Sequence, residues 1–157
     1  MESKKNKIIS VVLFIIGTEL VGYLSSLLAG NIGNVYTQLT KPPLSPPGQV
    51  FGIVWPILYA LMGLAMGLIF NREDHLAKQA LAWYLIQLGL NFMWSIIFFR
   101  FEARWLALVV LILLDIAVLY LLTLFYRINK VSFALLLPYL IWILFATYLN
   151  IGFAILN

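Results

Sequence analysis

Apolar residues form five long uninterrupted runs, and these runs predict five helices. The runs cover about residues 8–29, 48–70, 79–99, 105–126 and 133–155. Each is long enough to cross a bilayer as an α-helix, which takes roughly 20 residues. Three runs contain no Asp, Glu, Lys or Arg, and the other two contain one acid each. The pattern predicts an all-α membrane protein, a compact bundle of five transmembrane helices that forms one domain over residues 1–157.

Other architectures fit the runs poorly. Their hydrophobicity is continuous rather than periodic, which argues against the helices of a soluble domain. Strands of a membrane barrel would alternate in polarity over segments of about 10 residues. Composition points the same way, because 64% of the residues are hydrophobic and 10% are charged, whereas soluble domains average about 25% charged residues.

Composition also excludes several kinds of chemistry. The chain has no Cys and one His, His75, in the polar segment 71–75. Disulfides, thiolate nucleophiles, iron–sulfur clusters and Cys-ligated zinc are therefore excluded. A His–His metal site and axial His ligation of a haem in the membrane core are excluded as well. The net charge of +4 is spread over the ends and loops without a basic stripe, so we expect no nucleic acid partner.

The basic residues predict how the chain lies in its membrane. Seven Lys and Arg fall in the N-terminal segment and the loops 71–78 and 127–132, and three fall on the other side. The positive-inside rule then places the N-terminus inside and the C-terminus outside. The first run could be a cleaved signal peptide, but it is too long for one and no Ala-x-Ala site follows it. We expect it to be the first helix.

The longest connection, residues 30–47, is expected to cover a site. Its four prolines, at 42, 43, 46 and 47, restrict the backbone and make the loop stiff. Long ordered loops in compact proteins are usually lids or binding loops. A passive spacer is the alternative, and the polar positions below favour the lid.

Three predicted helices carry aromatic and amide residues on one face. The faces are Trp55, Tyr59, Met62 and Met66; Gln87, Asn91, Trp94, Ser95 and Phe98; and Pro138, Trp142, Ala146, Leu149 and Asn150. These spacings place each set on one helix side. A single membrane amide would most simply join two helices. Three amides beside three tryptophans, all toward the outer end, predict instead an aromatic cavity under the 30–47 loop that suits a flat, apolar ligand.

Two further features allow a functional and a structural interpretation. Glu19 and Asp115 are acids within the membrane, where proton coupling is the usual suggestion. Neither has a basic partner in its own segment, so we expect protonated or hydrogen-bonded acids that face neighbouring helices. Gly63 and Gly67 form a GxxxG pattern that suits close helix packing, within the bundle or between protomers.

Three motifs in order resemble one known family. They are Tyr36…Lys41-Pro42…Pro46-Pro47…Phe51…Val54-Trp55…Leu58-Tyr59…Met62-Gly63, then Gln87…Leu90-Asn91…Trp94-Ser95…Phe98-Phe99, then Pro138-Tyr139…Trp142…Phe145-Ala146-Thr147…Leu149-Asn150. The chain resembles the TspO/translocator protein family over its whole length, and its bacterial members most of all. Members of this family are also called tryptophan-rich sensory proteins or peripheral benzodiazepine receptors.

The resemblance implies a function and a set of site residues. It implies a homodimer in a bacterial cell membrane that binds protoporphyrin IX and isoquinoline carboxamide or benzodiazepine drugs, with no tightly bound cofactor. It implies pocket positions at Tyr36, Tyr59, Asn91, Trp94, Ala146 and Asn150, and a pair, Trp55 and Trp142, that breaks down porphyrin in light. The faces above add Gln87, Phe98 and Leu149 to the expected ligand-binding set, and Pro47 of the covering loop completes it.

Two alternative functions remain at this point. The first is a transporter of porphyrin, sterol or other lipophilic molecules, against which stand the absence of a repeat and of an ion-coupling site. The second is a structural membrane protein without a ligand, against which stand the matching amide and tryptophan faces. The cholesterol motif of mitochondrial members ends in a cation, and no cation follows Tyr148 here.

Overall fold

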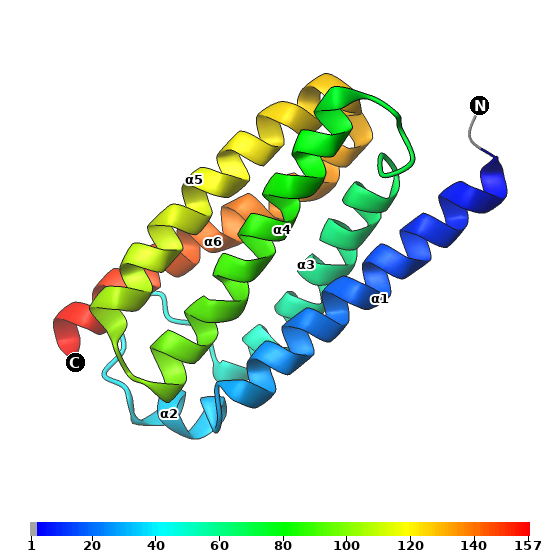
Figure 1. The fold of residues 1–157 in the computed structure, drawn as a ribbon. Helices are drawn as coiled ribbons and strands as arrows, with labels where there is room; N and C mark the ends of the chain where they lie inside the picture. The colour runs from blue at the N-terminus through cyan, green and yellow to red at the C-terminus, as the bar shows by residue number, and fades with distance from the viewer. Residues whose placement is uncertain (1–2) are drawn as a thin grey trace.

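The protein is an all-helical bundle in the computed structural model, which describes residues 3–157 (Figure 1). In chain order the elements are α1 Lys4–Leu28, α2 Ile32–Gln38, α3 Gly48–Gly67, α4 His75–Ser95, the π-helical turn η1 Ile96–Arg100, α5 Arg104–Ile128 and α6 Lys130–Leu156. No strand occurs within these residues. Five helices, with α4 and η1 counted as one, are long and apolar enough to cross a membrane. The predicted fold class is confirmed.

Side-chain caps place the helix ends that hydropathy alone does not fix. The Asp74 side chain accepts a hydrogen bond from the Leu76 amide at 2.7 Å and starts α4 at His75. This first turn is polar, so the apolar run predicted a start only near residue 79. Asn129 ends α5, and its side chain accepts from the Val131 amide at 2.9 Å to start α6. Capping residues satisfy amides that the helix itself leaves free.

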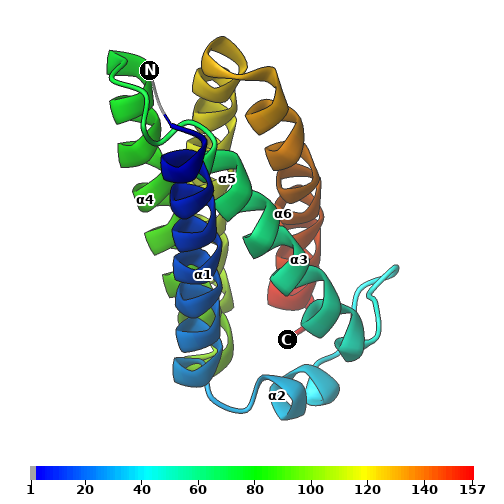
Figure 2. The same ribbon diagram turned by 90° about the vertical axis from the view of Figure 1, so that its right-hand side faces the viewer.

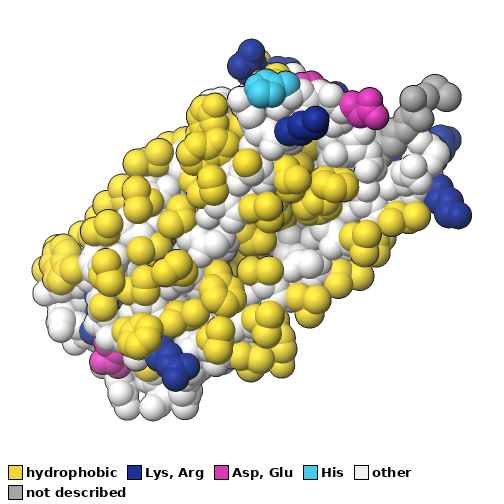
Figure 3. Space-filling model, viewed as in Figure 1, with side chains coloured by type: hydrophobic (Ala, Val, Ile, Leu, Met, Phe, Trp, Pro, Cys, Tyr) yellow, Lys and Arg dark blue, Asp and Glu magenta, His cyan; other side chains and the backbone are white. Residues whose placement is uncertain are grey.

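The bundle is not packed in simple chain order. Helix α1 lies along α3, α4 along α5, α5 along α6, and α6 along α3. The N-terminal end of α1 and the C-terminus lie at opposite ends of the bundle, and α2 lies across the end that holds the C-terminus (Figures 1 and 2). Charged side chains gather at the two ends, while the flank between them is largely apolar (Figure 3). This distribution fits a protein that spans a bilayer.

Helices α1 and α3 touch backbone to backbone at one end and separate toward the other. A Cβ on Gly63 would lie 2.5 Å from Ile15 Cα, and one on Gly67 would lie 2.5 Å from Val11 Cα. The GxxxG pattern is therefore used inside the chain. Further along, the Tyr59 ring packs directly against Gly22. The helices diverge from there toward α2 (Figure 2).

The 30–47 loop contains α2, which the sequence did not predict. Asn31 caps α2 by accepting from the Asn34 amide at 3.2 Å. The remainder of the loop is fastened to α6, since the Tyr148 hydroxyl donates to the Pro43 carbonyl at 2.7 Å. The Asn157 side chain accepts from the Thr40 amide and donates to the Thr40 carbonyl, both at 2.9 Å. The loop thus lies against the bundle at both of its halves.

Candidate functional site

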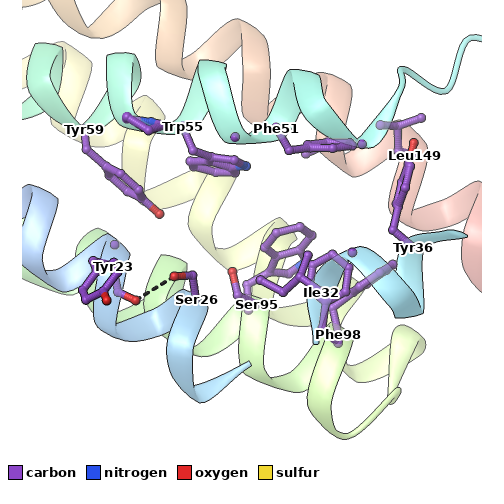
Figure 4. A pocket seen from close by; sticks show the side chains of 18 of the residues that line it. Tyr23, Ser26, Ile32, Tyr36, Phe51, Trp55, Tyr59, Ser95, Phe98 and Leu149 are labelled. Atoms are coloured by element: carbon purple, nitrogen blue, oxygen red, sulfur yellow. Dashed lines mark hydrogen bonds between the residues drawn. The ribbon is translucent and has the colours of Figure 1, made fainter. Parts of the chain in front are cut away.

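A cavity of about 460 Å³ lies between α1, α2, α3, α4 with η1, and α6. Helices α1 and α3, which diverge toward α2 (Figure 2), both line it, and α2 lines it as well (Figure 4). Its wall is mostly apolar and aromatic. The wall contains one acidic side chain and, within the described residues, no Lys, Arg or His. Sites of roughly 300–1,000 Å³ with such walls hold drug-sized molecules.

The cavity brings together most of the predicted binding residues. Eight of the twelve lie on its wall: Tyr36, Trp55, Tyr59, Trp94, Phe98, Ala146, Leu149 and Asn150. They come from five elements, α2, α3, α4, η1 and α6, that meet only in the folded bundle. The other four, Pro47, Gln87, Asn91 and Trp142, do not line the cavity.

Gln87 and Asn91 lie behind the wall and form a buried hydrogen-bonded chain. The Tyr59 hydroxyl donates to Asn91 Oδ1 at 3.1 Å, and Asn91 Nδ2 donates to the Tyr139 hydroxyl at 2.7 Å. That hydroxyl donates in turn to Gln87 Oε1 at 2.9 Å. In hydrocarbon an amide takes any polar partner within reach, and here the partners come from neighbouring helices. A ligand in the cavity would touch Tyr59 but neither amide.

Trp142 also lies behind the wall, screened by two side chains of α3. Its ring meets Phe51 edge to face at 5.7 Å and Trp55 edge to face at 6.4 Å. Phe51 and Trp55 both line the cavity. The periodicity of α6 correctly groups Trp142 with Ala146 and Asn150, but it carries no information on which side chains of another helix stand in front.

Pro47 is an exposed residue at the N-terminal cap of α3. The preceding residue, Pro46, is the one that contacts a residue of the cavity wall. The Tyr36 hydroxyl donates to the Pro46 carbonyl at 2.5 Å. Burial raises the pKa of that hydroxyl above its ordinary value, so it stays protonated and able to donate at neutral pH. This bond ties α2 to the start of α3 across the cavity.

An aromatic roof covers the cavity on the α2 side. It is formed by the rings of Tyr36, Phe51 and Phe153, with Tyr36 at its centre. The Tyr36 ring meets Phe51 at 5.1 Å and Phe153 at 5.8 Å, both edge to face. Lys41 Nζ lies 4.9 Å from the centroid of the same ring. Only 5% of Tyr36 is exposed. The roof is therefore packed into the bundle rather than resting on it.

The far wall is held by a second polar contact. Trp94 Nε1 donates to Asn150 Oδ1 at 2.9 Å, and Asn150 Nδ2 donates to the Arg104 carbonyl at 3.0 Å. Both side chains are buried. Because each polar group is satisfied by the other or by backbone, Trp94 presents the face of a fixed indole to the cavity.

Helix α1 supplies a wall that the sequence analysis did not predict. Glu19, Tyr23 and Ser26 follow a helical spacing on it, and all three line the cavity. Figure 4 shows Tyr23 and Ser26 on this wall. The expectation that Glu19 faces a neighbouring helix is therefore wrong. The sequence does carry a signal for this wall, because these three polar side chains form a stripe on the first helix, although the stripe contains neither an amide nor a tryptophan.

Asp115, the second intramembrane acid, points to a neighbouring helix rather than into the cavity. It is buried, and its Oδ2 accepts a hydrogen bond from the Thr147 hydroxyl of α6 at 2.6 Å. It does not line the cavity. The interpretation as a hydrogen-bonded acid facing a neighbouring helix is confirmed. Residues 3–157 contain no group of three or more His, Asp and Glu side chains placed to hold a metal ion.

The fold and the cavity together define a class of protein, namely a small α-helical membrane protein with an aromatic chamber inside its bundle. Comparison with known proteins gives the family. Residues 10–156 match the TspO/MBR family, and the chain belongs to that family.

Named relatives agree with this assignment. The chain is 37% identical over 151 residues to the "Tryptophan-rich protein TspO" of Archaeoglobus fulgidus, which covers 96% of this chain and 98% of that protein. It is 36% identical over 115 residues to the "Tryptophan-rich sensory protein" of Cereibacter sphaeroides, covering 73% and 72%. The human "Translocator protein" is 36% identical over 118 residues, covering 73% and 70%.

Proposed function

We propose that the protein is a membrane receptor or sensor that binds protoporphyrin IX in the cavity. Flat drugs of the isoquinoline carboxamide and benzodiazepine types would occupy the same space. One observation carries the proposal: an aromatic cavity of about 460 Å³, roofed by α2, inside a bundle of this family. Aromatic walls stack on flat conjugated rings, and each such contact adds about 0.5–1.5 kcal/mol beyond the burial of area.

The arrangement of rings supports a flat ligand in particular. Trp55 and Trp94 lie 6.4 Å apart with planes inclined by 35°, and Trp94 continues onto Phe98 at 5.5 Å and 33°. Three ring faces of similar inclination thus follow one another along the wall. The wall offers no His, so the porphyrin would be held by stacking and apolar contact, without an axial ligand.

Light-dependent degradation of the bound porphyrin is the chemistry we propose for this site. An excited porphyrin takes one electron from the Trp55 indole, which leaves an indole radical cation and a porphyrin radical anion. Dioxygen accepts that electron from the porphyrin radical anion and becomes superoxide. The indole radical cation then regains an electron from the porphyrin, and the porphyrin radical cation combines with superoxide, so both oxygen atoms end in the opened macrocycle. Trp142, edge to face with Trp55 at 6.4 Å, can share the radical cation until the porphyrin returns the electron.

Transport of porphyrin, sterol or another lipophile is the alternative. The floor of the cavity favours binding over passage, because Tyr59 closes it and is held by the hydrogen bond to Asn91. Below the floor, Met62, Ala65 and Met66 are fully buried. A solute would have to break this packed and hydrogen-bonded layer in order to cross.

The setting of the protein follows from the same proposal. We expect a homodimer in a bacterial cell membrane, with the N-terminus inside. The end with the N-terminus carries the larger share of Lys and Arg, which supports this orientation. The cavity would then open toward the outer side of the membrane.

Filling the cavity tests the proposal directly. Ala146→Phe places a ring in the wall, and Leu144→Phe places the same ring on the outward face of α6, where Leu144 is 48% exposed. Titration with protoporphyrin IX, followed by tryptophan quenching, should show lost binding for the first variant and wild-type binding for the second. Equal binding by both variants would place the porphyrin elsewhere.

A further inference from the structure

Glu19 is an acid on the wall of an otherwise apolar cavity. It lies in the middle of α1 and is partly buried. No residue from 3 to 157 forms a hydrogen bond or an ion pair with its carboxyl group. The cavity wall holds no basic side chain that could neutralise it. The carboxyl group therefore faces the cavity without a protein partner.

Three polar groups on the cavity wall are engaged with partners other than Glu19. The Tyr59 hydroxyl donates to Asn91 Oδ1 at 3.1 Å. The Ser26 hydroxyl donates to the Tyr23 carbonyl of its own helix at 2.7 Å. On the opposite wall, Trp94 Nε1 donates to Asn150 at 2.9 Å. None of these donors is left to serve the carboxyl group, so its hydrogen-bond acceptors are available to a ligand.

A carboxyl group in such surroundings favours a particular ligand chemistry. An ionised acid in a weakly polar space is unfavourable unless a positive charge accompanies it. The attraction between two opposite charges is also much stronger there than in water. A ligand that places a protonated amine beside Glu19 neutralises the carboxylate and also gains this stronger attraction. Its aromatic body would fill the space between α1 and α3.

We propose that Glu19 makes the cavity selective for flat aromatic molecules that carry a protonated amine. This inference rests on the proposed function, because it assumes that the cavity binds flat aromatic molecules. The same charge orients a porphyrin, whose two carboxylates must point away from Glu19. They then lie toward α2, where Lys41 lies over the Tyr36 ring.

A charge series on one ring system tests the selectivity. The probes are 9-aminoacridine, acridine and acridine-9-carboxylate, which share a flat three-ring body and carry a positive, no, and a negative charge at mildly alkaline pH. Affinities are measured by calorimetry on protein in an uncharged detergent. For the wild type we expect 9-aminoacridine to bind at least about tenfold more tightly than acridine, which corresponds to about 1.4 kcal/mol. The carboxylate should bind most weakly.

Variants assign the selectivity to the residue. Glu19→Gln should bring 9-aminoacridine within about threefold of acridine, a difference well under 1 kcal/mol, and leave acridine itself unchanged. Glu19→Asp should keep the preference for the cation. Asp115→Asn removes the other intramembrane acid, which lies off the cavity wall, and should keep the wild-type order.

The outcomes separate this inference from the proposed function. Equal wild-type affinities for the three acridines, or an unchanged order in Glu19→Gln, would overturn the role of Glu19 and leave porphyrin binding intact. Failure of all three probes to bind would overturn it as well. Loss of protoporphyrin IX binding in the wild type would overturn the proposed function itself. The wild-type charge series needs no variant and decides the matter even if Glu19→Gln folds poorly.

Discussion

The indole rings of Trp55 and Trp142 meet edge to face, with centroids 6.4 Å apart and planes at 89°, and of the two only Trp55 lines the cavity. A ligand would therefore contact Trp55 directly and sense Trp142 only through it. The pair is arranged in series, from the cavity into the protein, rather than as two equal walls.

This order predicts unequal effects on light-driven chemistry. Trp55→Phe should nearly abolish the light-dependent loss of porphyrin absorbance, and Trp142→Phe should slow it less. Porphyrin affinity should change little, because Phe keeps the stacking surface and an aromatic pair is worth only about 0.5–1.5 kcal/mol beyond area burial. The measurement is absorbance under illumination, with and without oxygen. If both variants degrade porphyrin at the wild-type rate, the reaction is photobleaching by dissolved oxygen.

Ala146→Thr should weaken ligand binding without unfolding the protein. Ala146 is 6% exposed and lines the cavity, so a larger side chain intrudes on the ligand. Overpacking costs about 1–3 kcal/mol, which corresponds to a loss of about five- to 150-fold in affinity. Titration with protoporphyrin IX measures the loss, and the thermal midpoint measures folding. Leu144→Thr, on the exposed face of the same helix, is the control, and equal affinities for the two variants would contradict the expectation.

Tyr36→Phe should loosen the 30–47 loop. The substitution removes the donor to the Pro46 carbonyl at 2.5 Å, and one hydrogen bond is worth about 0.5–1.5 kcal/mol. Hydrogen exchange in residues 30–47 should quicken in the variant and slow in the wild type when ligand is added. Equal exchange in all states would make the loop a passive spacer.

The same contact has a predicted pH dependence. Burial raises the pKa of the Tyr36 hydroxyl, so the protonated donor is retained in the folded protein. Its stabilising effect should be complete below the ordinary tyrosine pKa of 10.0. It should be lost only as the pH rises through the higher folded-state value. A loop protection factor, which corrects the exchange rate for the base-catalysed rise of intrinsic amide exchange with pH, that falls already between neutral pH and pH 9 would contradict this assignment.

Gly63→Ala should destabilise the bundle, whereas Gly89→Ala should not. The new Cβ at Gly63 would meet the Ile15 backbone at 2.5 Å, and backbone cannot move aside cheaply. We expect a cost of about 1–3 kcal/mol. At Gly89 nothing lies within 4 Å of the new Cβ, and the gain in helix propensity is about 1 kcal/mol. Thermal unfolding in detergent compares the two variants. A Gly63→Ala variant as stable as the wild type would contradict the close backbone contact between α1 and α3.

The sequence predicted the membrane helices well because each is a long apolar run, and length with hydropathy is enough to recognise such a run. It did not predict α2, since seven residues between polar and proline-rich segments carry no clear period. It also missed η1, whose i to i+5 bond joins the Phe101 amide to the Ile96 carbonyl at 3.2 Å. Such π-helical turns are frequent at functional sites, and Phe98 within this one lines the cavity.

The sequence predicts a cavity-lining side chain correctly where its position on one helix face is enough to expose it to the cavity. It fails where side chains of neighbouring helices cover or engage the residue. Trp94, Ala146 and Asn150 reach the cavity as their spacing indicates. Asn91 and Trp142 share those same faces, yet one is engaged by Tyr59 and Tyr139 and the other is covered by α3. Single-chain periodicity defines the direction of a side chain but not its distance from a cavity formed by other segments.

The glycine contact sets the distance between α1 and α3 at one end of the cavity. Because Gly63 and Gly67 press backbone on backbone, the two helices cannot approach more closely there. The other end of α1 is held by α4 and η1 instead, since the Ser25 hydroxyl donates to the Phe92 carbonyl at 2.8 Å and Arg100 donates to the Leu28 carbonyl at 3.1 Å. The α1 wall of the chamber is thus a beam fastened at both ends, and its separation from α3 is built into the fold.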